Sequence, residues 1–216
     1  VTTPGSTASR EAAEVAAGLL DDVAEMLARA QEELGALDSV AGDGDHGIGM
    51  ANGSRAAAGA AHAAVSAGGG LRTTLTAAGD AWSNRAGGTS GALWGALLTA
   101  LGSALGDEKT PGSDDLVAAL QAALSAVQRL GGAEVGDKTL VDALSPFVAA
   151  FVATDGDLAA KSAAAVVAAE AGTESTRALV ARLGRARPLG EKSVGTPDPG
   201  AVSLTKVVTL LNSRLS

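Results

Sequence analysis

Alanine dominates the apolar residues of this chain of 216 residues, whereas aromatic residues make up only 2% of it. Side chains as small as alanine fill a core only when the backbones that carry them pack closely. Alanine also has the highest helix propensity of the twenty residues. No segment shows the alternation of apolar and polar residues that is typical of a strand. The composition and patterning therefore predict an all-α fold.

Apolar periodicity locates the helices. Between residues 10 and 34 the apolar residues recur at spacings of three and four, which indicates one buried helical face. Similar stretches, separated by glycine-rich interruptions, predict the other helices. Residues 1–9 are expected to form a flexible lead-in, and residues 10–216 to form a single domain. The remaining helical stretches are expected at residues 48–67, 71–86, 92–105, 113–130, 140–154, 157–171, 173–183 and 201–215.

Charge and composition exclude several classes of protein. The net charge is −8 and no basic run is present, which argues against nucleic acid as a partner because phosphate neutralisation needs clustered Lys and Arg. The absence of cysteine excludes a thiolate metal site and a cysteine nucleophile. No apolar run is long enough to cross a membrane, and no secretory signal is visible. We therefore expect a cytoplasmic protein that binds neither nucleic acid nor membrane.

Three aspartates, Asp38, Asp43 and Asp45, lie within eight residues of one glycine-rich stretch, DSVAGDGDHG. Their carboxylates repel one another unless a cation or an array of donors offsets the charge, and glycines let the backbone turn the oxygens toward one point. Such oxygen ligands favour Mg²⁺ or Ca²⁺ over zinc. The spacing does not match an EF-hand, because position 12 counted from Asp43 is Ser54. A solvated acidic turn is the alternative.

A second glycine-rich stretch, GGTSG at residues 87–91, precedes a predicted helix. Backbone N–H groups at a helix start point toward an anion, and Thr89 and Ser90 add hydroxyl donors, so the stretch has the features of a phosphate cradle. An ordinary turn between helices is the alternative. For His46 three roles are open, namely capping a helix, pairing with an acidic neighbour or contacting a phosphate. His62, in an alanine-rich helix, is interpreted as a surface or interface residue.

Two further polar loops precede predicted helices. GDKT occupies residues 136–139, and GEKSVGTPDPGA occupies residues 190–201. Asp198 lies between two prolines in a stiff turn, which suits a residue that presents fixed acceptors to a ligand. The alternative for Asp198 is an N-cap of the last helix, and the two roles are compatible.

In this order and at these separations, the four loops resemble the nucleotide-binding L subunit or domain of dihydroxyacetone kinases, over about residues 10–215. The resemblance implies an eight-helix antiparallel barrel with a nucleotide pocket at one end. It also implies two Mg²⁺ ions held by Asp38, Asp43 and Asp45, and bound ADP or ATP. The metal would supply the positive charge that this acidic chain lacks. The nucleotide contacts implied by the resemblance are His46, Gly47, Gly49, Thr89, Ser90, Gly131, Thr139, Arg185, Asp198, Pro199 and Gly200, with Arg187 as the alternative to Arg185. No side chain acts as a covalent nucleophile.

Members of that family bind their ketone through a histidine of a separate K subunit or domain, and nothing in this chain resembles that part. The resemblance therefore implies half of a kinase that phosphorylates dihydroxyacetone or a related short ketose. Two versions stay open: an ATP-dependent enzyme in which L is fused to K, and a free L subunit whose ADP is recharged by a phosphotransferase-system protein. The short lead-in favours the free subunit. The alternatives from other classes are a non-catalytic nucleotide- or metal-sensing module that binds a regulatory protein, and a structural bundle.

Overall fold

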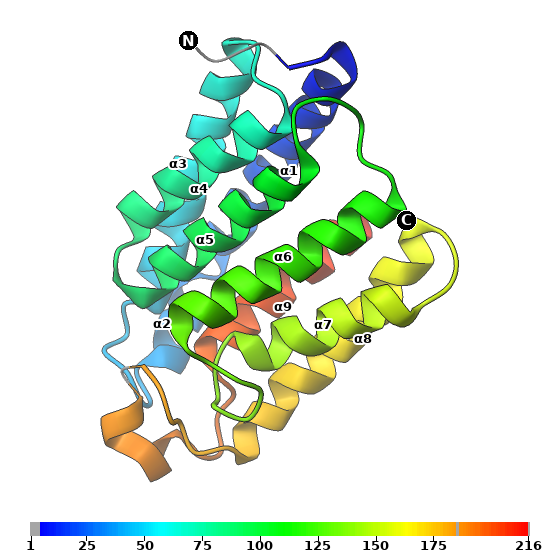
Figure 1. Cartoon of the computed structure of the whole chain (residues 1–216). Coiled ribbons are helices and arrows are strands. Elements are labelled where there is room, and N and C mark those ends of the chain that lie inside the picture. Colours follow the sequence, from blue (N-terminus) through cyan, green and yellow to red (C-terminus); the bar gives the residue numbers. More distant parts are fainter. Residues whose placement is uncertain (1–4, 185, 216) are drawn as a thin grey trace. The chain divides into compact units, whose positions relative to one another are not determined.

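The computed structural model describes residues 5–184 and 186–215 (Figure 1), and within them the chain is helical with no strand. The all-α prediction is confirmed. In these residues nine α-helices are joined by loops, with two short 3-10 helices at Thr176–Ala178 and Arg187–Ser193. The α-helices are α1 (Thr7–Arg29), α2 (Gln31–Asp38), α3 (His46–Ser66), α4 (Leu71–Ala86), α5 (Gly88–Leu105), α6 (Ser113–Gly131), α7 (Val141–Ala153), α8 (Leu158–Ser175) and α9 (Pro199–Ser213).

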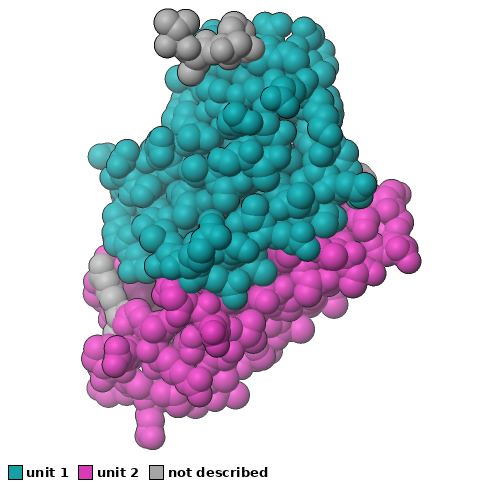
Figure 2. Space-filling model, in the orientation of Figure 1, with its two compact units in different colours: residues 1–28, 49–130 teal, residues 29–48, 131–216 magenta. Residues whose placement is uncertain are grey.

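The described residues form two compact units, which Figure 2 colours teal and magenta. Unit 1 comprises residues 1–28 and 49–130, and unit 2 comprises residues 29–48 and 131–216. The helix predicted for residues 10–34 divides at this boundary, because the chain leaves α1 after Arg29 and starts α2 at Gln31. No glycine or proline marks the break in the sequence, so periodicity alone predicts one continuous helix there.

Unit 1 contains a close pair of helices, α4 and α5. Trp82 and Trp94 stack between them with ring centroids 4.9 Å apart and ring planes 7° apart. A Cβ atom on Gly95 would lie 2.7 Å from the carbonyl oxygen of Gly79, so the two backbones touch where both residues are glycine. The small residues of this chain therefore permit a helix contact that larger side chains would separate.

Unit 2 is built around α7, α8 and α9, which pack against one another, and α2 packs on α9. Its core includes Phe147 and Phe151 on α7 and Leu204 on α9, all buried. A second expectation is wrong here, because α8 continues through Gly172 to Ser175, and the rest of the stretch predicted as a separate helix, up to residue 183, contains only the 3-10 turn Thr176–Ala178. A Cβ on Gly172 would collide with the carbonyl oxygen of Asp142 on α7. This glycine therefore marks a close helix contact rather than a helix end.

Among the described helices, none combines the length and the apolar character that crossing a lipid bilayer requires.

Candidate functional site

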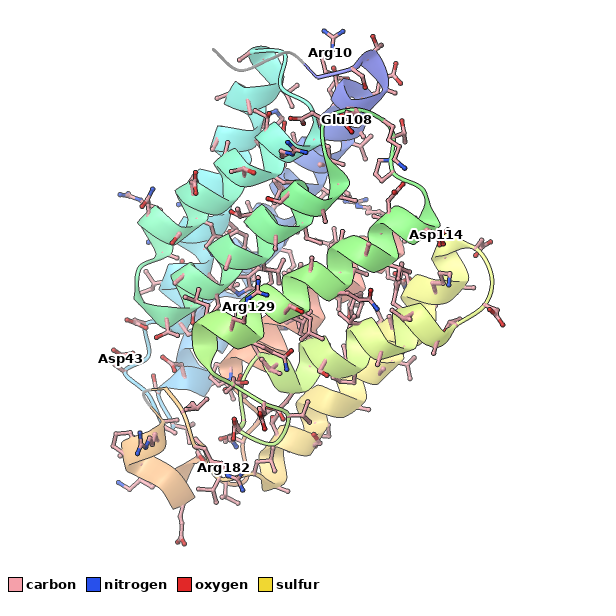
Figure 3. The ribbon with its side chains drawn as sticks, viewed as in Figure 1. Arg10, Asp43, Glu108, Asp114, Arg129 and Arg182 are labelled. Atoms are coloured by element: carbon pink, nitrogen blue, oxygen red, sulfur yellow. The ribbon has the colours of Figure 1, made fainter. Side chains whose placement is uncertain are left out.

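The three aspartates of the acidic loop converge. Asp38 is the last residue of α2, and Asp43 and Asp45 lie in the loop that leads to α3, where Figure 3 labels Asp43. One carboxylate oxygen from each lies within 4.8 Å of the others. Asp38 is half-buried, whereas Asp43 and Asp45 are exposed. Three carboxylates at this separation form a donor set that a hard divalent cation such as Mg²⁺ fits, because the cation removes their mutual repulsion.

Glycines set the shape of the acidic loop. Gly44 has φ +79°, a left-handed conformation that glycine adopts readily. A Cβ on Gly42 would collide with a carboxylate oxygen of Asp38 and would lie 2.8 Å from the backbone carbonyl oxygen of Asp38, so the close approach of the chain to Asp38 favours glycine here. The Asp38 carboxylate also accepts the backbone N–H of His46, 3.3 Å away, at the start of α3. The loop is therefore anchored to the helices on both sides of it.

The ring of His46 connects the acidic loop to α9. The side chain is 7% exposed, and its Nε2 lies 3.1 Å from the hydroxyl of Ser203. The Ser203 hydroxyl also lies 3.0 Å from the carbonyl oxygen of Gly200, so it joins the His46 ring to the first turn of α9. Burial lowers the pKa of His46, and the negative charge of Asp38 partly opposes this. The acidic loop and the start of α9 thus lie at the same end of unit 2.

Asp198 is the N-cap of α9, and Pro199 is the first helical residue. The Asp198 carboxylate accepts the N–H of Ala201, 2.8 Å away, and the Asp198 N–H donates to the hydroxyl of Thr176, also 2.8 Å away. Desolvation raises the pKa of Asp198 to about 7, with a further upward contribution from Asp142. The capping alternative is therefore confirmed, and the contact with a ligand stays a prediction.

The raised pKa of Asp198 predicts a pH dependence of folding. The folded carboxyl holds its proton up to about pH 7, whereas the unfolded one loses it near 3.8, so stability falls as pH rises between these values. Each pH unit in this window removes up to about 1.4 kcal/mol. An Asp198→Asn variant keeps an N-cap and lacks this titration. Urea unfolding at pH 5 and 7.5 should show wild type losing about 2 kcal/mol more than the variant. Parallel losses in the two proteins would contradict the assignment.

The GDKT loop is braced by an aspartate that follows it. Asp142, 2% exposed on α7, accepts the N–H of Gly136 at 2.6 Å and the N–H of Thr139 at 2.7 Å. The hydroxyl of Thr139 accepts the N–H of Val141, 3.1 Å away. Of this loop the resemblance implies only Thr139 as a nucleotide contact. The structure shows in addition that Asp142 and Lys138, which is 5% exposed, are buried and that Asp142 holds the loop in place.

The predicted phosphate cradle at residues 87–91 is mostly helical. Only Gly87 separates α4 from α5, and α5 begins at Gly88 rather than near residue 92. Gly87 and Gly88 have φ of +66° and +60°, which is why two glycines stand at this turn. Thr89 is exposed and Ser90 half-buried, both in the first turn of α5. The expected combination of hydroxyls and a helix N-terminus is therefore present, in unit 1.

The other predicted contacts are distributed over both units. Gly47 is buried in the first turn of α3, where a Cβ would collide with the carbonyl oxygen of Gln31. Gly131 ends α6, and Arg185 lies outside the described residues. His62 is exposed on α3 and pairs with Asp21 at 2.7 Å, as expected of a surface residue. Most of the predicted site residues belong to unit 2: Asp38, Asp43, Asp45, His46, Gly47, Gly131, Thr139, Asp198, Pro199 and Gly200. The others, Gly49, Thr89 and Ser90, belong to unit 1.

Comparison with known proteins identifies relatives over nearly the whole chain. A family model described as the DAK2 domain matches residues 40–213. The chain is 54% identical to D-erythrulose kinase of Mycolicibacterium smegmatis over 199 residues, which cover 90% of this chain and 34% of that protein. It is 32% identical over 199 residues to "PEP-dependent dihydroxyacetone kinase 2, ADP-binding subunit DhaL" of Listeria innocua, covering 91% of this chain and 92% of the subunit.

A solved structure shares the fold. The dihydroxyacetone kinase of C. freundii, crystallised with AMP-PNP and Mg²⁺, superposes with a TM-score of 0.73 at 29% identity, covering 99% of this chain and 35% of that one. The chain thus spans about a third of the erythrulose kinase and of the C. freundii enzyme, and nearly all of the Listeria subunit. On the family model and the Listeria relative together, this chain belongs to the DAK2 domain family.

Proposed function

We propose that this chain binds a Mg²⁺-nucleotide and is the phosphoryl-donating part of a short-ketose kinase. One observation carries the proposal: three carboxylates converge within 4.8 Å at the end of unit 2 where Asp198 caps α9. The relatives support it, because the C. freundii structure is a complex with AMP-PNP and Mg²⁺ and the Listeria relative is named an ADP-binding subunit. The names of these relatives also favour a kinase over the sensing module.

Asp38, Asp43 and Asp45 hold the metal in this proposal, with two Mg²⁺ ions as the expected number. Bound Mg²⁺ would supply the positive charge that offsets the nucleotide phosphates. The backbone of His46, Gly47 and Gly49 and the hydroxyls of Thr89 and Ser90 would line those phosphates, since N–H groups in the first turn of a helix point toward an anion. Around the base and ribose the proposal places Gly131, Thr139, Arg185, Asp198, Pro199 and Gly200.

The proposed reaction needs no covalent nucleophile from this chain. Its residues bind and orient the nucleotide, and catalysis comes mainly from positioning and charge neutralisation. The acceptor would be a hydroxyl of dihydroxyacetone or erythrulose held by a K subunit or domain. Two phosphoryl donors are compatible with the proposal: ATP that exchanges as a substrate, and bound ADP that a phosphocarrier protein recharges.

The direct test of the reaction combines the purified chain with the separately produced K part of an erythrulose kinase, Mg²⁺, ATP and a ketose. Formation of ketose phosphate that requires both proteins supports the proposal. Absence of product together with absence of Mg²⁺-nucleotide binding contradicts it. Denaturing the purified chain and identifying the released nucleotide separates the two donors: about one ADP per chain points to the recharged subunit, and an empty protein that binds Mg-ATP reversibly points to ATP as substrate.

A further inference from the structure

Lys138 occupies an unusual position for a charged side chain. It is 5% exposed, and its ammonium Nζ donates to four backbone carbonyl oxygens. The acceptors belong to Ser193 at 2.6 Å, Thr196 at 2.7 Å, Thr176 at 2.8 Å and Leu179 at 3.2 Å. An ammonium has three N–H groups, so the longest bond shares a hydrogen with another. Four carbonyl oxygens around one ammonium resemble the coordination of a bound metal cation, except that the cation here is a lysine side chain.

All four carbonyls belong to the segment between α8 and α9, residues 176–196, which contains the 3-10 turns and is labelled at Arg182 in Figure 3. Few of its side chains are buried, so apolar packing contributes little to its order. Ser193 is an exception: its hydroxyl accepts the N–H of Ala181 at 3.1 Å and donates to the carbonyl oxygen of Gly190 at 2.6 Å. The Lys138 ammonium therefore holds the two ends of this segment together around one charge.

The backbone at Lys138 is held in an unfavourable conformation. With φ +62°, it is the one residue other than glycine with positive φ in the part of the chain that the structure describes. A residue with a Cβ atom is disfavoured in this left-handed region. The Asp142 carboxylate fixes the conformation, because it accepts N–H groups from Gly136 and Thr139 on either side of the lysine. The strained backbone conformation at Lys138 therefore directs its side chain inward.

Two short connections run from the ammonium to Asp198. Thr176, whose carbonyl binds Nζ, accepts the N–H of Asp198 with its hydroxyl. Thr196, whose carbonyl also binds Nζ, is two residues before Asp198 in the chain. Burial lowers the pKa of Lys138, whereas the negative charge of Asp198 acts in the opposite direction. The lysine, the segment and the turn that caps α9 therefore form one connected network.

We propose that Lys138 is a positioning residue whose ammonium acts as an internal cation: it orders residues 176–196 and thereby fixes the Asp198 turn for nucleotide binding. The last step rests on the proposed function. The ordering of the segment does not, so the two are tested separately.

Limited digestion with trypsin tests the ordering. The segment offers cleavage sites after Arg182 and Lys192, so a loosened segment is cut there. A Lys138→Met variant, shown to be folded by circular dichroism, should be cut within the segment at least about tenfold faster than wild type, because local opening exposes the sites. The matched control is Lys161→Met, which removes another ammonium bonded to a carbonyl of unit 2, that of Thr154 at 2.5 Å. An equal rate in Lys138→Met and wild type would overturn the proposal.

Chemical rescue tests the charge itself and covers the case in which Lys138→Met does not fold. Lys138→Gly suits φ +62° and leaves room for n-butylammonium, which has the atoms of the missing side chain. We expect n-butylammonium, but not n-butanol, to restore slow amide hydrogen exchange in the segment; hydrogen exchange replaces digestion here because the amine also competes for the lysine pocket of trypsin. Restoration by neither, or equally by both, would overturn the role as an internal cation.

Nucleotide affinity tests the second step. Lys138→Met should weaken Mg-ADP binding by about tenfold or more, the loss typical of removing a residue that orients ligand-binding groups, while Lys161→Met leaves it unchanged. Unchanged affinity in a variant with a loosened segment would overturn the link to Asp198. If wild type itself binds no Mg-ADP, the proposed function fails, and digestion still decides whether Lys138 orders the segment.

Discussion

An Asp43→Asn variant is expected to lose Mg²⁺-dependent nucleotide binding and, in a complex with a K part, ketose phosphorylation. The substitution keeps the shape of the side chain and removes one of three carboxylates whose oxygens lie within 4.8 Å of one another. A bound metal typically contributes several kcal/mol of charge stabilisation. Weakening its site by one ligand charge should therefore raise the Kd for Mg-ADP about 100-fold, at about 1.4 kcal/mol per tenfold change.

The folding stability of the metal-free protein distinguishes a residue that binds metal from one that has a structural role. Three neighbouring carboxylates repel one another in the metal-free protein, so Asp43→Asn should leave that form at least as stable as wild type. Asp155→Asn, which removes the same charge from an exposed position between α7 and α8, is the matched control and should bind Mg-ADP normally. An Asp43→Asn protein with wild-type affinity and turnover would contradict the metal assignment.

A Gly95→Val variant should lose about 3 kcal/mol of folding free energy, the upper part of the range for overpacking. A Cβ at this position would lie 2.7 Å from the carbonyl oxygen of Gly79 and 2.8 Å from the Cβ of Ser83, both on α4. Because one of these contacts is backbone, no change of rotamer relieves it, and α4 and α5 must separate. Separation would also disturb the Trp82–Trp94 stack.

The control for Gly95→Val is a glycine of unit 1 that has space around it. Gly59 lies on the exposed side of α3, and a Cβ there would meet nothing within 4 Å. Gly59→Ala should therefore stabilise the protein by about 0.5–1 kcal/mol, because alanine loses less backbone entropy on folding. Chemical unfolding of the three proteins measures both effects. Destabilisation by Gly59→Ala, or none by Gly95→Val, would contradict the packing described for α4 and α5.

Local sequence signals predict much of this fold. Alanine-rich periodicity predicts most of the helices, and the charge of Asp38, Asp43 and Asp45 in a glycine-rich stretch predicts their convergence, which the structure confirms. Asp198 before a proline is likewise a recognisable N-cap. These features depend on neighbouring residues in the chain, so the sequence contains the information directly.

Tertiary contacts decide the features that the sequence does not reveal. Gly172 looks like a helix end, yet it permits close approach of α8 to α7. The break at Ala30 has no breaker residue, and it coincides with the boundary between the units. Lys138 lies in the GDKT motif and Asp142 follows it closely, and both can be read from the sequence. The carbonyl and N–H groups that they bind come together only in the folded chain.

Titration of the purified chain with ADP, after removal of any copurified nucleotide, tests the central claim most directly when it is carried out once with Mg²⁺ and once with EDTA. The convergence of the three aspartates predicts saturable heat with Mg²⁺, about one ADP per chain, and a loss of affinity of about 100-fold or more in EDTA. Absence of binding in both conditions, or equal affinity in both, would contradict a Mg²⁺-nucleotide site in this chain.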